Sequence, residues 1–398
     1  MFKFMDLFAG IGGFHVALKD CGGECVFSCE IDKHCREVYE ENFHIAPFPD
    51  ITKITDADLP PEVDVVCGGF PCQPFSQLGY KKGFKDIRGT MFFEIVRILK
   101  HYIDINKPVR VVFLENVASL LWHDNGNTWK TIRHSLRELG YVLNDKPLVL
   151  SPDDIGVPQI RPRIFILAIW KGILPKDYKL PAQKDLDAHK RNLSVIGAYL
   201  EDNPSPDYVL SVKKQQILDV WDKFFKLLGD YIPHFLLMPA TWEPTYQMPE
   251  NTKQYLKIII KLNQEWYQEH KELCDKWMEE VNFKGLKFCI PKTYLQLRLN
   301  GYGLHSIYDY TIQGRANGWR VAPGYKIPTI TAQGNIPIIG KLKRYLTSRE
   351  LANFQSFPKD FKLSPYKAIC HKQLGNAVNV DCVRTVFKLL PEELISNN

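Results

Sequence analysis

The sequence predicts an α/β fold with a second, smaller, loop-rich domain, and three observations support this. Short apolar runs and amphipathic helical patterns alternate over residues 1–170, as expected of strands and helices around one sheet. A glycine-rich turn joins the first strand to the first helix. The alternation stops at Lys171, and segments of the same style return only after residue 345, which indicates a separate domain in between.

The composition is that of an ordinary globular protein. The 398 residues are 45% hydrophobic and 24% charged, and no apolar run approaches the length of a membrane span. The first residues lack the extended apolar core of a signal peptide, so we expect a cytoplasmic protein without membrane association. Its ten cysteines are then expected to be thiols. Cys21, Cys25, Cys29 and Cys35 crowd together without a Cys-x-x-Cys pair, which argues against a metal site.

The charge is unevenly distributed along the chain. The formal net charge is +6, but residues 281–345 contain ten Lys or Arg and a single acid, Asp309. That segment therefore carries nine net positive charges, and the remainder carries three net negative ones. A solvated basic face would give the same count. Because aromatic and amide side chains interleave with these charges, we expect a nucleic-acid partner.

The N-terminal segment has the pattern of a cofactor-binding turn. A strand over residues 2–8 leads into glycines 10, 12 and 13, and a helix is expected over residues 15–20. Strand, glycine turn and helix together cradle a nucleotide or nucleoside. The glycines lack the G-x-G-x-x-G spacing, so a dinucleotide dehydrogenase is poorly supported.

Acidic residues follow the next strands. A strand over residues 25–29 ends at Glu30, and an acid at that place suits the hydroxyls of a ribose. Asp32, two residues on, suits either the same role or that of a helix N-cap. Asp50 and Ile51 are expected at a third strand end, where the carboxylate would accept a hydrogen bond from an adenine amino group.

Residues 68–76 read Gly-Gly-Phe-Pro-Cys-Gln-Pro-Phe-Ser, which places Cys72 between two prolines. The prolines stiffen the backbone on both sides of the thiol. A buried strand over residues 63–68 comes before, so Cys72 is expected at a strand's carboxyl end, where open α/β sheets carry their chemistry. Taken alone, the segment favours a core cysteine near a turn over a nucleophile. The basic, glycine-rich residues 77–89 predict either a mobile loop that closes over a phosphate backbone or a plain surface loop.

A carboxylate and two arginines stand at later strands. Glu115 follows an apolar strand over residues 109–114, where a carboxylate is unfavourable unless it is paired or used. Arg161 and Arg163 alternate at the start of a strand over residues 159–168, so their side chains share one face. Such a pair suits an anion or a polar base edge, and structural salt bridges are the alternative.

The remaining periodicities predict further elements. The two helical segments near the middle of the chain have balanced charge, and their apolar stripes are expected to face a core. We expect helices at residues 90–100, 128–139, 211–230, 251–282 and 347–354, strands at 141–150 and 327–331, a linker at 171–210, and a last helix that ends at Leu390.

Six blocks of sequence together resemble the bacterial restriction–modification DNA (cytosine-5) methyltransferases of type II. They occur in the family's order and cover about 215 of the 398 residues, roughly 1–170 and 346–390. The blocks are Asp6-Leu-Phe-Ala-Gly-Ile-Gly-Gly-Phe14, Gly69-Phe-Pro-Cys-Gln-Pro-Phe-Ser76, Glu115-Asn-Val117, Gln159-Ile-Arg-Pro-Arg163, Arg349-Glu-Leu-Ala-Asn-Phe-Gln-Ser-Phe-Pro358 and Gln373-Leu-Gly-Asn-Ala-Val378.

The resemblance implies an S-adenosylmethionine-dependent methyltransferase fold, Rossmann-like with a mixed sheet. The catalytic domain would comprise residues 1–170 plus 346–398, and a target-recognition domain would comprise 171–345. The second domain would have a helical part, 211–282, and a basic loop-rich part, 283–345, and would face the first across a DNA cleft.

The resemblance also implies a mechanism. The Cys72 thiolate would add to C6 of a cytosine flipped out of the duplex, while Glu115 protonates N3. Carbon 5 would then take the methyl group of S-adenosylmethionine. Arg161 would contact the cytosine carbonyl oxygen, and Arg163 would orient the site. The expected partners are duplex DNA and, functionally, a cognate restriction endonuclease; we expect a monomer that protects host DNA.

Further contacts follow from the same resemblance. Since Asn376 must reach a cofactor bound by residues 8–13, the last helix is expected beside the first strand. The expected cofactor contacts are Phe8, Ala9, Gly10, Ile11, Gly13, Glu30, Ile31, Asp50, Ile51, Pro71, Asn376 and Ala377. The expected DNA contacts, for which phosphate binding and turn structure are alternatives to base reading, are Ser76, Lys81, Lys82, Gln313, Arg315, Asn317, Arg320, Thr329 and Gln333.

Two other functions remain open on the sequence. A tRNA cytosine-5 methyltransferase would share this fold, although the Cys-Phe-Thr block usual in that subfamily is absent. A catalytically silent DNA-binding module is a second alternative, and the intact Cys72, Glu115 and Arg161 argue against it.

Overall fold

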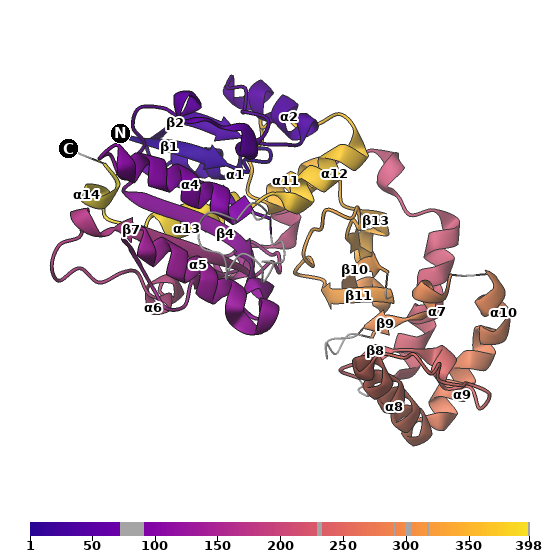
Figure 1. The fold of residues 1–398 in the computed structure, drawn as a ribbon. Helices are drawn as coiled ribbons and strands as arrows, with labels where there is room; N and C mark the ends of the chain where they lie inside the picture. Colours follow the sequence, from indigo (N-terminus) through magenta and orange to yellow (C-terminus); the bar gives the residue numbers. More distant parts are fainter. Residues whose placement is uncertain (72–90, 229–232, 290, 299–304, 317, 397–398) are drawn as a thin grey trace. The chain divides into compact units, whose positions relative to one another are not determined.

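A computed structural model describes residues 1–71, 91–228, 233–289, 291–298, 305–316 and 318–396. The chain divides into two compact units (Figure 1). The first comprises Met1–Val157, Arg161–Ser194 and Leu351–Asn398, and the second comprises Pro158–Ile160 and Val195–Glu350. Compared with the domain limits expected from the sequence, the first unit also includes residues 171–194, and the second includes 346–350.

Among the described residues, the first unit contains a mixed seven-stranded sheet in the order β2-β1-β3-β4-β7-β5, with β6 also paired to β7. The strands are β1 (Phe2–Leu7), β2 (Gly23–Cys29), β3 (Val65–Gly69), β4 (Val111–Val117), β5 (Tyr141–Leu143), β6 (Leu148–Leu150) and β7 (Arg163–Trp170). The first four are parallel, and β7 runs antiparallel to β4, β5 and β6. The predicted α/β class with a mixed sheet is therefore confirmed.

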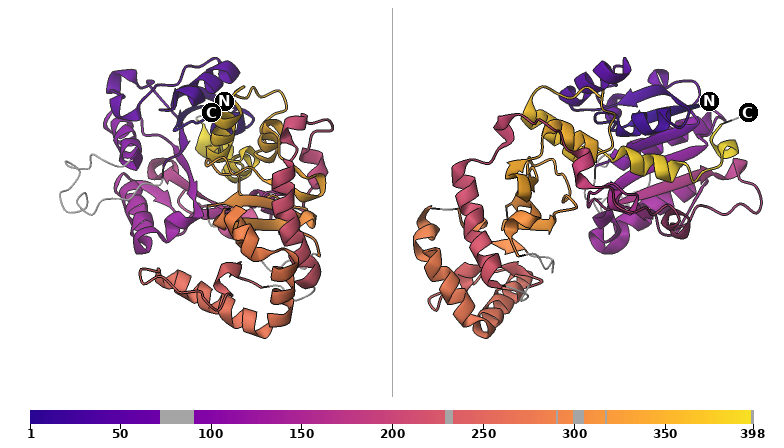
Figure 2. Two further views of the ribbon diagram at one scale, coloured as in Figure 1. Left: turned by 90° about the vertical axis from the view of Figure 1, so that its right-hand side faces the viewer. Right: turned by 180° about the vertical axis from the view of Figure 1, so that it is seen from behind.

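Helices cover both faces of this sheet. Along β4, Val112 and Leu114 face a core that includes Ile95 of α4 and Ile132 of α5. Phe113, between them, points to the other face, where it meets Phe14 of α1 at 5.3 Å between ring centroids. The ribbon views show helices on both faces of the sheet (Figures 1 and 2). The helices are α1 (Gly13–Lys19), α2 (Lys33–Phe43), α4 (Met91–Asp104), α5 (Asn127–Glu138), α6 (Gln183–Asp187), α11 (Ser348–Phe354), α12 (Lys367–Asn376), α13 (Val380–Phe387) and α14 (Glu392–Ile395).

The C-terminal segment returns to the first strand, as expected. Helix α13 packs against α1 (Figure 2). The ring of Phe387 lies 5.2 Å from that of Phe2 and 5.8 Å from that of Phe113. The approach is close at the glycine turn, where a Cβ on Gly13 would stand 2.7 Å from Cγ1 of Val378. The glycine turn and the segment after Asn376, which both adjoin predicted cofactor contacts, therefore lie close together within the first unit.

The second unit contains a six-stranded sheet among its described residues, in the order β13-β12-β10-β11-β9-β8. Its helices bury aromatic stripes, and the rings of Trp221 and Trp277 stack at 5.5 Å. The expectation that the apolar stripes of 211–230 and 251–282 face a core is thus confirmed for their described residues, 211–228 and 251–282. The elements are α7 (Val212–Leu228), β8 (Leu236–Leu237), α8 (Gln254–Glu269), α9 (Lys271–Glu280), α10 (Phe283–Cys289), β9 (Leu297–Arg298), β10 (Tyr310–Arg315), β11 (Gly318–Pro323), β12 (Ile338–Ile339) and β13 (Arg344–Tyr345).

Three predicted strands are wrong. Residues 141–150 form two short strands, β5 and β6, because the segment turns ahead of Pro147, which has no N–H to donate to a ladder. Residues 327–331 make only one isolated bridge, between Ile327 and Gln159. Asp50 does not end a strand but begins a short 3-10 turn, in which its side chain accepts the backbone N–H of Thr52.

Asp6 is fully buried in β1, beneath the glycine turn. Burial, reinforced by the charge of Glu30, raises its pKa to about 8, although hydrogen bonds from the His15 backbone and Tyr39 oppose this shift. His15, whose Nδ1 lies 2.7 Å from the Tyr39 hydroxyl, has its pKa lowered to about 4, first by burial. Both groups are therefore neutral at pH 7 inside the fold.

Asp6→Asn should flatten the pH dependence of stability between about pH 6.5 and 8. A raised folded-state pKa means that the stability contributed by Asp6 is lost as pH rises from about 4 toward 8, at up to about 1.4 kcal/mol per pH unit. His15 contributes the opposite slope, but only below its unfolded value near 6.5. Urea unfolding at pH 6.5, 7 and 7.5 measures the slopes, and parallel slopes in both proteins would contradict the expectation.

Candidate active site

The carboxyl ends of β3 and β4 form the centre of the site. Glu115 lies within β4, which continues to Val117 rather than ending at residue 114, and its register partner in β3 is Gly69. A Cβ on Gly69 would stand 3.1 Å from Oε2 of Glu115, so the glycine leaves room for the carboxylate. Cys72 follows three residues later and lies outside the described residues.

Asn116 fixes the segment that leads to this cysteine. Its Nδ2 donates a buried hydrogen bond of 2.8 Å to the carbonyl oxygen of Phe70, and its Oδ1 accepts the N–H of Val117. The end of β4 is thereby tied to the chain just before the exposed Pro71. The sequence does not predict this role for Asn116, because strand patterning does not show where an amide side chain points.

Glu115 and Arg163 form an ion pair of low exposure. Nε of Arg163 lies 2.9 Å from Oε1 of Glu115, and the two side chains are 14% and 12% exposed. Burial raises the pKa of Glu115, while the positive charges of Arg163 and Arg161 oppose the rise. The carboxyl group therefore binds a proton more readily than an exposed glutamate, which suits a proton donor.

Arg161 has a different environment. It is 2% exposed, and its Nη2 donates to the carbonyl oxygens of Gly375, at 3.0 Å, and Ala377, at 2.7 Å. Its backbone N–H donates to Oγ of Ser151 at 2.9 Å. Burial, followed by the charge of Arg163, lowers its pKa to about 9. Arg161 thus contacts backbone in the protein interior, and Arg163 is the arginine beside the carboxylate.

The glycine turn is held by Glu30. Oε2 of Glu30 accepts the N–H of Gly10 at 2.8 Å, and Oε1 accepts the N–H of Asp32 at 2.8 Å. A carboxylate has about four lone-pair positions, so two remain for a ligand. Asp32 is confirmed as the N-cap of α2, and it also pairs with Lys372 of α12 at 2.8 Å.

The other predicted cofactor residues fall into two groups. Ile31 is 74% exposed and Asn376 is exposed at the end of α12, so both side chains are accessible. Ile51 is 4% exposed and packs in the core, which leaves only its backbone for a contact. Asp50 already accepts the Thr52 hydroxyl, and this bond is the first cause of its lowered pKa.

The remaining predicted cofactor residues line the turn itself and the loop opposite it. Phe8 and Gly10 have φ of 56° and 55°, a left-handed backbone that turns their peptide groups out of β1. The side chains of Ala9, Ile11 and Ala377 are buried, and Gly13 begins α1.

Gln313, one of the expected DNA contacts, has its amide engaged within the second unit. Gln313 is fully buried in β10, and its Nε2 donates to the carbonyl oxygens of Asn335, at 2.5 Å, and Thr329, at 3.2 Å. Its Oε1 accepts Nε of Arg315 at 2.8 Å. Gln313 therefore joins the β10–β11 hairpin to the 329–335 segment, and its amide has no free edge for a base.

Other predicted DNA contacts have mixed environments. Arg315 and Arg320 are half-buried, and burial lowers the pKa of each. Thr329 donates its hydroxyl to the carbonyl oxygen of Ile160 at 2.7 Å, whereas Gln333 is exposed. Ser76, Lys81, Lys82 and Asn317 lie outside the described residues.

Arg344 is part of the basic segment, residues 281–345, but its side chain is buried. Arg344 is 6% exposed and forms a bidentate pair with Glu350, with its Nη1 and Nη2 at 2.8 and 2.7 Å from the two carboxylate oxygens. Its charge is therefore neutralised within the second unit.

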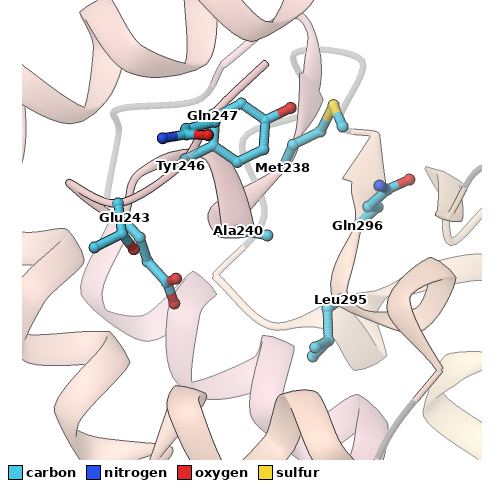
Figure 3. Close-up of a pocket in the computed structure, with 8 residues that line it drawn as sticks. Met238, Ala240, Glu243, Tyr246, Gln247, Leu295 and Gln296 are labelled. Atoms are coloured by element: carbon cyan, nitrogen blue, oxygen red, sulfur yellow. The ribbon is translucent and has the colours of Figure 1, made fainter. Parts of the chain in front are cut away.

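The second unit also contains a cavity of about 370 Å³ (Figure 3). Its lining includes a single carboxylate, Glu243, and none of the residues expected to act in catalysis or binding. The lining residues are Met238, Ala240, Glu243, Thr245, Tyr246, Gln247, Leu295 and Gln296. Across the residues that the structure describes, no cluster of His, Cys, Asp and Glu suits a metal ion, and no helix has the length and apolar character to cross a membrane.

Comparison with known proteins identifies close relatives. Residues 2–392 match the family model described as C-5 cytosine-specific DNA methylase. The type II methyltransferase M.HpaII of Haemophilus parainfluenzae is 44% identical, covering 99% of this chain and 90% of that protein. M.BanI of Aneurinibacillus aneurinilyticus is 33% identical, covering 100% and 96%. The match to M.HhaI of Haemophilus parahaemolyticus, at 43% identity, spans 50% of this chain and 58% of that protein.

Solved structures share the fold. The S. pombe Dnmt2 methyltransferase aligns with a TM-score of 0.56 and 18% identity, covering 99% of both chains. The Entamoeba histolytica methyltransferase EhMeth aligns with a TM-score of 0.54 and 17% identity, covering 99% of this chain and 98% of its own. These likenesses agree with the methyltransferase fold class expected from the sequence.

Arg163→Met should raise the pKa of Glu115 further. The substitution keeps a long side chain but removes the charge that lies 2.9 Å from the carboxylate, so burial is less opposed. Carbon-13 NMR of labelled glutamate, with Glu115→Gln to assign the signal, measures the shift. Arg137→Met is the control, because it removes an arginine that contacts the exposed Asp145 and the Leu143 carbonyl oxygen rather than Glu115. Equal Glu115 pKa values in Arg163→Met and the unmodified protein would refute the pairing.

Proposed function

This chain belongs to the C-5 cytosine-specific DNA methylase family, and we propose that it transfers the methyl group of S-adenosylmethionine to carbon 5 of a cytosine flipped out of duplex DNA. It is a DNA (cytosine-5) methyltransferase. The observation that carries the proposal is the Glu115–Arg163 pair beside Gly69, three residues before Cys72. The proposed nucleophile thus follows, in the sequence, the strand whose Gly69 adjoins the proposed proton donor.

Cys72 and Glu115 divide the chemistry between them. The Cys72 sulfur forms a bond to C6 of the ring, and the Glu115 carboxyl gives its proton to N3, so that negative charge does not accumulate on the ring. S-adenosylmethionine supplies the electrophilic methyl group that carbon 5 receives. A base then takes the proton from carbon 5, the C6–sulfur bond breaks to release the Cys72 thiolate, and N3 returns its proton to Glu115. The raised pKa of Glu115 supports this role, because the donor must be protonated when the base arrives.

We assign the two arginines in the reverse of the order expected from the sequence. Arg163 holds the carboxylate that meets N3, so its guanidinium is the one near enough to donate to the neighbouring carbonyl oxygen of the cytosine. Arg161 is buried against backbone carbonyls and has no place in that contact. Strand alternation placed both on one face, but β7 begins only at Arg163, so the alternation does not extend to Arg161.

The residues around the glycine turn fit S-adenosylmethionine. Glu30 keeps lone pairs for ribose hydroxyls while it holds the N–H of Gly10. The exposed Ile31 offers an apolar surface to adenine, and the free oxygen of Asp50 would accept its amino group. Asn376 would meet the methionine end.

For the target sequence, Arg315 and Arg320 are the proposed base readers, and Thr329 and Gln333 are proposed to lie at the DNA. Gln313 instead supports Arg315 from within the second unit. By analogy with the type II relatives, we infer that the enzyme protects DNA from a cognate restriction endonuclease. A cytosolic monomer is the proposed form.

Cys72→Ser should abolish methyl transfer. Serine oxygen is a much weaker nucleophile than a thiolate, so the bond to C6 does not form. Duplex DNA with tritiated S-adenosylmethionine measures the incorporation, and Cys21→Ser is the control, since that thiol lies after α1 away from Glu115. Methylation that survives in Cys72→Ser would exclude this residue as the nucleophile.

Arg315→Ala should slow methylation and relax the choice at one base pair. A bidentate contact to a guanine edge contributes about 1–3 kcal/mol of discrimination. Sequencing of methylated DNA from cells that produce the variant gives the site preference. Lys276→Ala, on the exposed surface of α9, removes the same charge and should change neither rate nor site. An unchanged pattern in Arg315→Ala would rule out base reading by this residue.

A further inference from the structure

The C-terminal end of α12 is capped by side chains from elsewhere in the first unit. The last carbonyl groups of a helix have no partners within it. Here Nη2 of Arg161 donates to Gly375 at 3.0 Å and to Ala377 at 2.7 Å. Nε2 of Gln355 donates to Leu374 at 2.7 Å and shares the Ala377 oxygen at 3.0 Å. Two side chains thus bind three carbonyl groups at the end of the helix, those of Leu374, Gly375 and Ala377.

The charge of Arg161 suits this place. A helix end carries a partial negative charge, which stabilises a buried cation placed against it. A guanidinium also presents its donors in a fixed plane, which lets one group bind two carbonyls at a defined separation. The segment from 374 to 378 therefore has a single well-determined backbone path.

That path contains the residues next to the proposed cofactor. Asn376 lies between the two carbonyl groups that Arg161 binds, and its side chain is exposed. Val378, two residues later, packs against Gly13 of the glycine turn. The backbone of Gln355 adds to the same anchor, because its carbonyl oxygen accepts the N–H of Val380 at 3.0 Å.

Arg161 is also close in the sequence to a residue that is proposed to act on the cytosine. Two residues along the chain, Arg163 carries the ion pair to Glu115. The backbone N–H of Arg161 donates to Oγ of Ser151, which fixes the chain shortly before Arg163. The Ser151 bond engages the backbone of Arg161 and not its guanidinium, so replacing the side chain should leave the start of β7 in place.

We propose that Arg161 is a positioning residue that holds the 374–378 segment in the conformation that receives S-adenosylmethionine. This inference rests on the proposed function, since it assumes that Asn376 faces that cofactor. Arg161 touches neither cofactor nor base. It acts through the backbone, with Gln355 as its partner on the opposite side of the Ala377 carbonyl group.

Arg161→Lys tests the proposal in the full chain. A lysine keeps the charge but does not bridge two carbonyls in one plane, so loss of one charged hydrogen bond should weaken S-adenosylmethionine binding about tenfold. Calorimetric titration without DNA gives the Kd, and steady-state rates give KM for each substrate. The expected result is a rise in Kd and KM for S-adenosylmethionine with KM for DNA unchanged. Arg163→Lys is the matched control, expected to lower kcat and leave the cofactor Kd unaltered.

Other outcomes decide against the inference or against the function separately. Wild-type affinity for S-adenosylmethionine in Arg161→Lys overturns the positioning role, and so does an equal rise in both KM values. If Arg161→Lys does not fold, Gln355→Met decides by the same titration, with an unchanged Kd counting against the proposal. Cys72→Ser should bind the cofactor normally. If the wild-type protein binds S-adenosylmethionine but transfers no methyl group to DNA, the proposed function is overturned instead.

Discussion

The site depends on how a carboxylate is accommodated inside the sheet. Glu115 is a member of β4 rather than of the loop beyond it, and a buried charge there is unfavourable unless it is paired. The structure meets this constraint with two features of neighbouring strands: the guanidinium of Arg163 at the start of β7 and the missing side chain of Gly69 in β3. They accommodate a carboxyl group whose pKa is raised by burial, and Asn116, next along β4, bonds to the segment that leads to Cys72.

The general form of the first unit could be predicted from the sequence because it depends on periodicity. Val112, Phe113 and Leu114 alternate between two cores, as a buried strand requires. The same kind of reasoning failed where a single backbone bond decides the outcome. Asp50 caps a turn instead of ending a strand, since its carboxylate finds the N–H of Thr52 nearby.

Side-chain roles were less predictable than elements. Arg161 and Arg163 have the same residue type and adjacent alternate positions, yet one meets helix carbonyls and the other a carboxylate. Gln313 has the chemistry to read adenine, but it is buried against Asn335. Such choices depend on partners distant in sequence, which residue patterns along one strand do not encode. The six sequence blocks indicate which residues belong to the site, but the role of each side chain depends on its tertiary contacts.

The second unit is not a simple insertion. Besides residues 195–350 it includes Pro158–Ile160, which bond to Ile327 through both backbone directions and to the hydroxyl of Thr329. A second unit transplanted from a relative at residues 195 and 350 would therefore lack its other segment, residues 158–160. An exchange of this unit between relatives has to include that short segment, which is covalently continuous with Arg161.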